Sequence, residues 1–121
     1  MMPRILAVDD SPSMRQMVST TLASAGYEVE QAEDGVQALQ LASRQRFDLV
    51  ITDVNMPNMD GITLVRELRG KPNYKFVPLL VLTTEATSER KQQGKSAGAT
   101  GWLVKPFNPE RLLATIAKVL A

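Results

Sequence analysis

The chain has 121 residues, 14 of them Lys or Arg and 13 of them Asp or Glu, which gives a formal net charge of +1. That length fits one globular domain over residues 1–121, and the balanced charge speaks against binding to nucleic acid or to a membrane surface. The sequence contains no Cys and no His, which excludes disulfides, thiolate nucleophiles, imidazole metal sites and histidine-dependent triads. Any chemistry therefore falls to carboxylates, hydroxyls, amides, Lys and Arg.

Short apolar runs alternate with stretches of helical periodicity along the chain. The runs predict strands at residues 5–8, 27–32, 49–52, 79–82 and 102–104. Capping residues and apolar spacing predict helices that begin near Ser11, Asp34, Asp60 and Asn108, with a further helix-like stretch over 89–96. In the first helix, we expect Met14 and Met17 on the core face and Gly26 at the end.

The alternation of strands and helices predicts an α/β fold with a doubly wound parallel sheet, right-handed crossovers and helices on both faces. Four of the five runs are continuously apolar, which is typical of strands covered on both faces. The run Glu28-Val29-Glu30-Gln31 instead alternates between charged or polar and apolar residues. This second strand is therefore predicted to lie at an edge of the sheet.

Polar side chains follow four of the predicted strands directly. They are Asp9 and Asp10, then Asp53, then Thr83, and finally Lys105. Because the carboxyl ends of parallel strands lie along one edge of a sheet, we expect these side chains to converge. Each of these residues has an ordinary explanation when taken alone. An Asp often caps a helix or forms a turn, a Lys is often solvated at the surface, and a Thr hydroxyl often bonds within its own turn. The prediction of a site depends on their convergence.

The predicted cluster has a definite chemistry. Carboxylates that crowd together repel one another and need a cation, and oxygen ligands without His or Cys favour Mg²⁺, with Mn²⁺ as a substitute. Lys105 offers a point charge and Thr83 a hydrogen-bond donor to the oxygens of a phosphoryl group. One of the carboxylates could then act as the nucleophile and form an aspartyl phosphate.

These residues resemble the receiver domain of two-component response regulators, most closely chemotaxis regulators of the CheY type. The resemblance spans nearly the whole chain. It rests on Asp9-Asp10, the run from Asp53 to Gly61, Thr83 and Lys105-Pro106-Phe107. It implies a flavodoxin-like (βα)5 fold whose five-stranded parallel sheet has the order 2-1-3-4-5, an order that the residues themselves do not supply.

The resemblance also implies roles for the clustered residues. Asp53 is similar to the phosphoacceptor and also to a metal ligand, Asp10 to a direct metal ligand, and Asp9 to an assisting ligand. The backbone carbonyl of Asn55 resembles a further metal ligand. Lys105 resembles the lysine that contacts the phosphoryl group.

Further positions match the conformational switch of the family. Thr83 resembles the switch hydroxyl, and Trp102 stands at the aromatic switch position, where Tyr or Phe is commoner. An alternative is that Trp102 only packs against the last helix. The bond before Pro106 is expected to be cis. Asn55 and Glu85 stand where the family tunes dephosphorylation.

The function implied is a signalling switch rather than a conventional enzyme. Asp53 would take a phosphoryl group from a CheA-like histidine kinase in a Mg²⁺-dependent reaction, and the domain would catalyse its own phosphorylation and autodephosphorylation. Chemotaxis is the expected setting, with a flagellar switch protein or another output acting in trans and a phosphatase as a possible further partner. The first apolar run is too short for a signal peptide or a membrane span, so we expect a cytoplasmic protein, and a monomer.

Three alternatives stay open at this point. Within the receiver interpretation, the chain could be a phosphorelay shuttle or a phosphate sink. A phosphatase of the haloacid dehalogenase type uses a similar set of residues, but it needs an Asp two residues after the nucleophile, where this chain has Asn55. A docking domain of the same fold that is never phosphorylated is the third alternative.

Overall fold

The computed structural model describes residues 2–84 and 87–121. Within these residues, five parallel strands form one sheet of order β2-β1-β3-β4-β5. The strands are β1 (Arg4–Val8), β2 (Glu28–Ala32), β3 (Leu49–Thr52), β4 (Leu79–Thr83) and β5 (Gly101–Val104). The helices are α1 (Pro12–Ser24), α2 (Gly35–Arg44), α3 (Gly61–Arg69), the short 3-10 helix η1 (Pro72–Tyr74), α4 (Ser88–Ala97) and α5 (Pro109–Leu120). The predicted α/β fold and strand order are confirmed.

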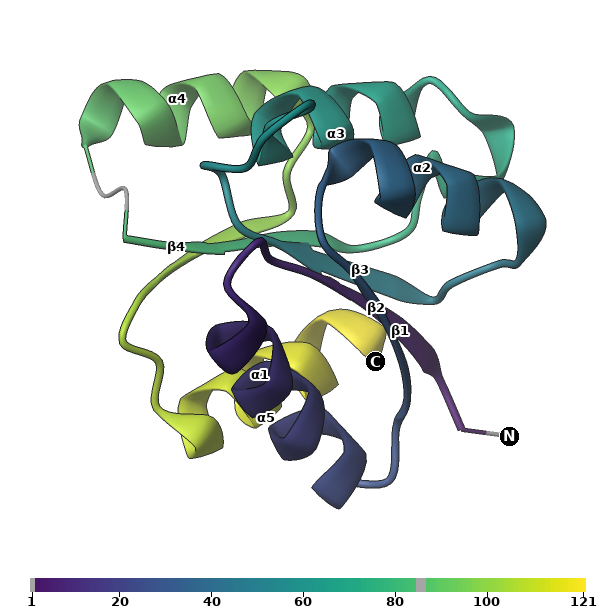
Figure 1. Ribbon diagram of the computed structural model, residues 1–121, viewed down its shortest axis with the longest axis vertical. Coiled ribbons are helices and arrows are strands. Elements are labelled where there is room, and N and C mark those ends of the chain that lie inside the picture. Colours follow the sequence, from purple (N-terminus) through teal and green to yellow (C-terminus); the bar gives the residue numbers. More distant parts are fainter. Residues whose placement is uncertain (1, 85–86) are drawn as a thin grey trace.

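Helices cover both faces of the sheet. Figure 1 shows α2, α3 and α4 on one face and α1 and α5 on the other. Side chains alternate along β1, so that Leu6 and Val8 join the apolar cluster under the first layer, while Ile5 and Ala7 join the cluster under the second. Both sets are buried, which explains why the strand reads as a continuous apolar run.

The two edges of the sheet differ from its centre. β2 is an edge strand with mostly exposed side chains, as its alternating sequence predicts. β5 was expected to be covered on both faces, and this expectation is wrong. Its residues are only partly buried, and Val104 is 43% exposed. The reason is its position: β5 is the other edge, with a single neighbouring strand.

The core face of α1 also differs from the prediction. Val18, Ser19 and Leu22 are buried and Met14 is partly buried, but Met17 is 55% exposed. Residues four apart lie on one helical face, whereas Met17 points away from the direction that Val18 and Leu22 share. Apolar spacing alone did not fix which way the helix turns toward the sheet.

The helix caps follow the sequence closely. Ser11, Asp34, Asp60, Thr87 and Asn108 each accept a hydrogen bond at the side chain from a backbone N–H three residues later. Such bonds satisfy backbone donors that the first turn of a helix leaves without partners. Gly26 follows α1 with a φ of 95°, a conformation that glycine adopts without strain. Among the described helices, none is both long and apolar enough to span a membrane.

One long-range contact had no signal in the sequence. The Arg69 guanidinium donates to the backbone oxygens of Tyr74 at 2.7 Å, Val77 at 2.6 Å and Gly98 at 2.8 Å. The side chain thereby joins the end of α3 to the segment before β4 and to the end of α4. Since the carbonyls come from two separate segments, residues 74–77 and Gly98, no local pattern predicts the contact.

Candidate functional site

The predicted convergence of carboxylates is present at the carboxyl edge of the sheet. Asp9 and Asp10 follow β1 and Asp53 follows β3, its neighbour in the sheet. The Asp53 N–H donates to the carbonyl of Val8 at 2.9 Å, so strand pairing continues to the site itself. One oxygen of each of the three carboxylates lies within 4.8 Å of the others.

Lys105 reaches this cluster from the end of β5. Its Nζ lies 2.7 Å from Asp9 Oδ2 and 3.2 Å from Asp53 Oδ2. The side chains of Lys105, Asp9 and Asp53 are 9%, 7% and 12% exposed, so this is a largely desolvated arrangement. Burial alone would lower the pKa of Lys105, but the hydrogen bond to Asp9 and the charges of Asp53 and Asp9 outweigh it and raise that pKa above its ordinary value of 10.5. Lys105 is therefore a cation at neutral pH.

The second oxygens of the two buried carboxylates are held by the backbone. Asp9 Oδ1 accepts from the N–H of Ser11 at 2.9 Å, and Asp53 Oδ1 accepts from the N–H of Val54 at 2.7 Å. Arg15 donates from its guanidinium to the Asp9 carbonyl at 2.7 Å. Each carboxylate therefore has one oxygen fixed by its own loop and one directed at Lys105. Asp10, by contrast, is exposed to solvent.

The close packing of α3 on the nucleophile candidate explains a glycine. A β-carbon on Gly61 would lie 1.8 Å from the backbone oxygen of Asp53, a distance that no side chain tolerates. The Gly61 N–H donates to the carbonyl of Val54 at 2.9 Å. The start of α3 thus lies directly against the backbone of the site, and only glycine fits there.

The loop between β3 and α3 is also fixed from the side of α2, by contacts that sequence reasoning missed. The Asn58 amide donates to Asp34 Oδ2 at 2.8 Å, and Asn58 has a φ of 68°, which Asn tolerates better than most residues. The Gly35 N–H donates to the Met59 carbonyl at 3.2 Å. Hydrogen bonds from Gln37 and Asn58 lower the pKa of Asp34, so its carboxylate stays charged. This loop carries Asn55, which is exposed.

Thr83 and the segment at Lys105 lie on the adjacent strands. Thr83 ends β4 and is fully buried, and its carbonyl accepts from the Lys105 N–H at 2.9 Å. The Lys105–Pro106 bond is cis, as expected. Glu85, the other residue assigned to dephosphorylation, lies outside the described residues.

Trp102 lies on the α4 side of β5. It packs against the apolar cluster that includes Ala97, and its six-membered ring faces Gly94 of α4. The structure therefore assigns its packing to α4, and the alternative that it simply packs against the last helix is wrong. Its neighbour Leu103 instead joins the cluster that contains α5 residues, as strand alternation requires.

The donor set of the cluster fits Mg²⁺. All three side chains offer carboxylate oxygens, the hard ligands that Mg²⁺ prefers, and Asp10 is open to solvent for an ion that keeps several of its waters. Lys105 already neutralises part of the charge. A divalent ion would offset the remaining negative charge.

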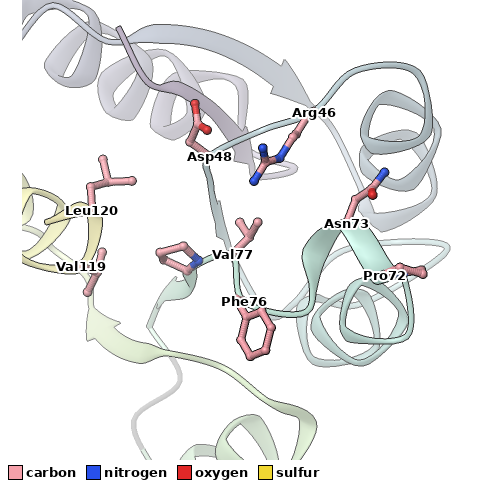
Figure 2. A pocket seen from close by; sticks show the side chains of 9 residues that line it. Arg46, Asp48, Pro72, Asn73, Phe76, Val77, Val119 and Leu120 are labelled. Atoms are coloured by element: carbon pink, nitrogen blue, oxygen red, sulfur yellow. The ribbon is translucent and has the colours of Figure 1, made fainter. Parts of the chain in front are cut away.

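A separate hollow lies at the opposite end of the strands, near the residues that precede β3 and β4. Figure 2 shows it between the segment before β4, where Phe76 and Val77 lie, and the end of α5, with Val119 and Leu120. Its volume is about 510 Å³, and Phe76 on its rim is 88% exposed. None of the predicted site residues lines it. The predicted site residues lie instead at the carboxyl ends of the strands.

Comparisons with known proteins agree with this site. The chain is 60% identical to chemotaxis protein CheY4 of Vibrio cholerae, with a TM-score of 0.95 over 98% of this chain and 99% of that one. It is 32% identical to the receiver domain of sensor histidine kinase PA1611 from Pseudomonas aeruginosa PAO1, with a TM-score of 0.92 over 99% and 98% of the two chains. That structure holds a magnesium ion in its active site cleft.

Some relatives are longer than this chain. The DNA-binding dual master transcriptional regulator RpaA of Synechocystis is 40% identical over 98% of this chain but only 49% of its own length. The chain thus spans about half the length of the first curated relatives that it matches. The model of the response regulator receiver domain matches residues 5–117. The chain belongs to the response regulator receiver domain family of two-component systems.

Proposed function

We propose that this chain is a phosphoryl-accepting switch in which Asp53 takes a phosphoryl group from a histidine kinase and thereby changes the binding of a partner. One observation carries the proposal. Lys105 Nζ lies 2.7 Å from Asp9 and 3.2 Å from Asp53, inside a cluster that also includes Asp10. Such a cluster holds a carboxylate nucleophile beside a fixed positive charge, the arrangement that phosphoryl transfer needs.

The proposed reaction begins with attack by Asp53. A carboxylate oxygen forms a bond to phosphorus while the bond from phosphorus to the donor's histidine nitrogen breaks, and the electron pair stays on the imidazole. Lys105 stabilises the negative charge on the transferred group, because its own charge is fixed close to Asp53. Mg²⁺, when held by Asp9, Asp10, Asp53 and the backbone carbonyl of Asn55, supplies further positive charge.

The later steps use the residues around the cluster. Phosphorylation adds negative charge beside Lys105 and Thr83, and this charge biases the surface formed by α4, β5 and α5 between two states. Trp102 lies in that surface. In the dephosphorylation step, water forms a bond to phosphorus while the bond from phosphorus to the Asp53 oxygen breaks, so inorganic phosphate leaves and the carboxylate is restored. Asn55 and Glu85 tune the rate of this step. Catalysis is thus limited to the domain's own phosphorylation and dephosphorylation.

Chemotaxis is the proposed setting. CheY4, 60% identical, is named a chemotaxis protein, and the similarity extends over nearly the whole of both chains. A flagellar switch protein is accordingly the proposed partner, with the chain acting as a monomer in the cytoplasm. A role as a relay shuttle or a phosphate sink uses the same site and differs only in which proteins bind. A phosphatase of small molecules fits less well, since the Asn55 amide cannot act as an acid or base.

The nucleophile is tested by Asp53→Asn. We expect this variant to fold normally and to lose all labelling by an acyl phosphate, because an amide is not a nucleophile for phosphorus. Phosphate incorporation, followed by mass spectrometry with Mg²⁺ present, measures the effect. Asp34→Asn is the matched control, since it removes a partly buried carboxylate that contacts the same loop through Asn58 but lies outside the carboxylate cluster. Labelling that persists in Asp53→Asn would disprove the assignment.

The metal site is tested by thermal unfolding. Millimolar Mg²⁺ should raise the melting temperature, because an ion that binds only the folded cluster stabilises it. Asp10→Ala should remove this response, and Asp48→Ala, a carboxylate at the opposite edge of the sheet, should keep it. If Mg²⁺ has no effect on the wild-type melting temperature, the proposed metal site is wrong.

The charge of Lys105 is tested by its pH dependence. In the presence of a chelator, Lys105→Met should lower the free energy of unfolding at pH 7 by about 1–3 kcal/mol, because two largely buried carboxylates lose their charged partner. The folded-state pKa of Lys105 is raised above 10.5. The stabilisation should therefore be fully present below pH 10.5 and should disappear as the pH rises through the folded-state pKa.

Lys105→Arg serves as the control for this experiment, because a guanidinium keeps its charge in that alkaline range. Urea unfolding of the three proteins between pH 7 and 11.5 provides the comparison. A difference between wild type and Lys105→Met that is already absent at pH 7 would contradict the proposed role of the ion pairs.

The output is tested by affinity capture from the source cells. The immobilised chain is used with and without Mg²⁺ and beryllium fluoride, which mimics the phosphoryl group, and Asp53→Asn is the control that cannot be activated. We expect a component of the flagellar motor to be enriched only by the activated chain. If only a histidine kinase or a phosphotransfer protein is enriched, the chemotaxis output is wrong and the shuttle or sink is favoured.

A further inference from the structure

The contact between Trp102 and α4 depends on one position of the helix. A β-carbon built on Gly94 would lie 2.6 Å from Cζ3 and 2.9 Å from Cε3 of the indole. Carbon atoms that are not bonded to each other normally stay about 3.5–4.0 Å apart. The six-membered ring of Trp102 therefore occupies the space that a side chain at position 94 would fill.

No other feature of the backbone explains a glycine at position 94. The residue lies in the helix α4 (Ser88–Ala97), and it is not among the glycines with positive φ, which are Gly26 and Gly98. Glycine is a poor choice inside a helix, where Ala is favoured. The approach of the indole is the reason that the structure offers for Gly94.

Trp102 has space on both sides. A hollow of about 320 Å³ lies beside the ring on the α4 side and is lined by Lys91, Lys95 and the residues that lead into β5. A second hollow of about 330 Å³ lies between β5 and α5 and is lined by Phe107, Arg111 and other residues. An indole that left Gly94 could therefore lie over the second hollow.

We propose that Gly94 is a positioning residue for Trp102. Because Gly94 has no side chain, the indole can lie directly against α4. The size of the side chain at position 94 sets the balance between this position of the ring and one over the hollow beside Phe107. The consequence for partner binding rests on the proposed function, in which this face of β5 binds the output protein. The position of the indole itself does not depend on that function.

Fluorescence tests the position of the ring, because Trp102 is the only tryptophan of the chain. In the unphosphorylated protein without Mg²⁺, Gly94→Ala should shift the emission to longer wavelength and raise the acrylamide quenching constant. Ser96→Ala, an exposed position of the same helix, should change neither. Unchanged emission and quenching in Gly94→Ala would overturn the proposal.

Thermal unfolding in two backgrounds separates the clash from the effect of Ala on the helix. Gly94→Ala should lower the melting temperature of the chain that has Trp102. The same change should raise it in Trp102→Phe, since the smaller ring leaves space for the methyl group and Ala favours the helix. An equal rise in both backgrounds would contradict the proposal.

The functional consequence has its own measurement. Gly94→Ala should leave the labelling of Asp53 by an acyl phosphate unchanged while altering the amount of partner captured by the beryllium fluoride form, and Trp102→Phe should reduce this difference. Unaltered capture despite a fluorescence shift would overturn the link to partner binding. If wild type is not labelled at all, the proposed function fails, while the fluorescence and unfolding results still decide the role of Gly94.

Discussion

The balance between Lys105 and the crowded carboxylates constrains the rest of the structure. The order of the sheet places β1 beside β3, so Asp9 and Asp53 must meet at the carboxyl edge. Two like charges about 4 Å apart repel by about 4 kcal/mol at an effective dielectric constant of about 20. Lys105 Nζ, which contacts both, offsets this repulsion from a strand two positions away from β3. A fold built for stability alone would place an apolar residue at one of these positions.

Around this charged centre the backbone is tightly held. The Gly61 position lies against the Asp53 carbonyl, and the Asn58 amide links the same loop to Asp34 at the start of α2. These contacts hold the backbone of the nucleophile candidate in place, and they leave its Oδ2 directed at Lys105. Preorganisation of this kind favours transfer of a charged group, because the backbone that carries Asp53 is already held in place before charge develops.

Local chemistry explains which parts of the fold could be predicted from the sequence. Helix caps such as Asp34 and Asp60 bond to a backbone N–H only three residues away, so the local sequence predicts them. A continuous apolar run likewise predicts a strand that is covered on both faces. Parallel strands alone predicted that Asp9, Asp53 and Lys105 lie at the same end of the sheet, where the structure brings them into contact. The strand order came from the resemblance to receiver domains, since strand lengths and helix periods do not distinguish one order from another.

What could not be predicted depends on contacts between distant segments. Apolar spacing placed both Met17 and Val18 on one broad face of α1, but it does not say which part of that face meets the sheet. The exposure of Met17 was therefore not predicted. The partial exposure of β5 reflects its place at an edge, which an apolar triplet does not reveal. The sequence alone does not explain Gly94, because a glycine inside a helix is simply unfavourable. Its role becomes visible only when the structure places the indole of Trp102 beside it.

Lys105 connects the carboxylate cluster to the partly exposed edge strand β5. Lys105 contacts Asp53 through its side chain, and its backbone directly follows Val104 and donates to the carbonyl of Thr83. In the proposed switch, charge added at Asp53 would act on the Lys105 ammonium, and Lys105 is only three residues from Trp102 in the chain. The edge position of β5 leaves space on both sides of that side chain. If β5 were a central strand, Trp102 would be packed on all sides in the core, and a change at Lys105 could not move its side chain.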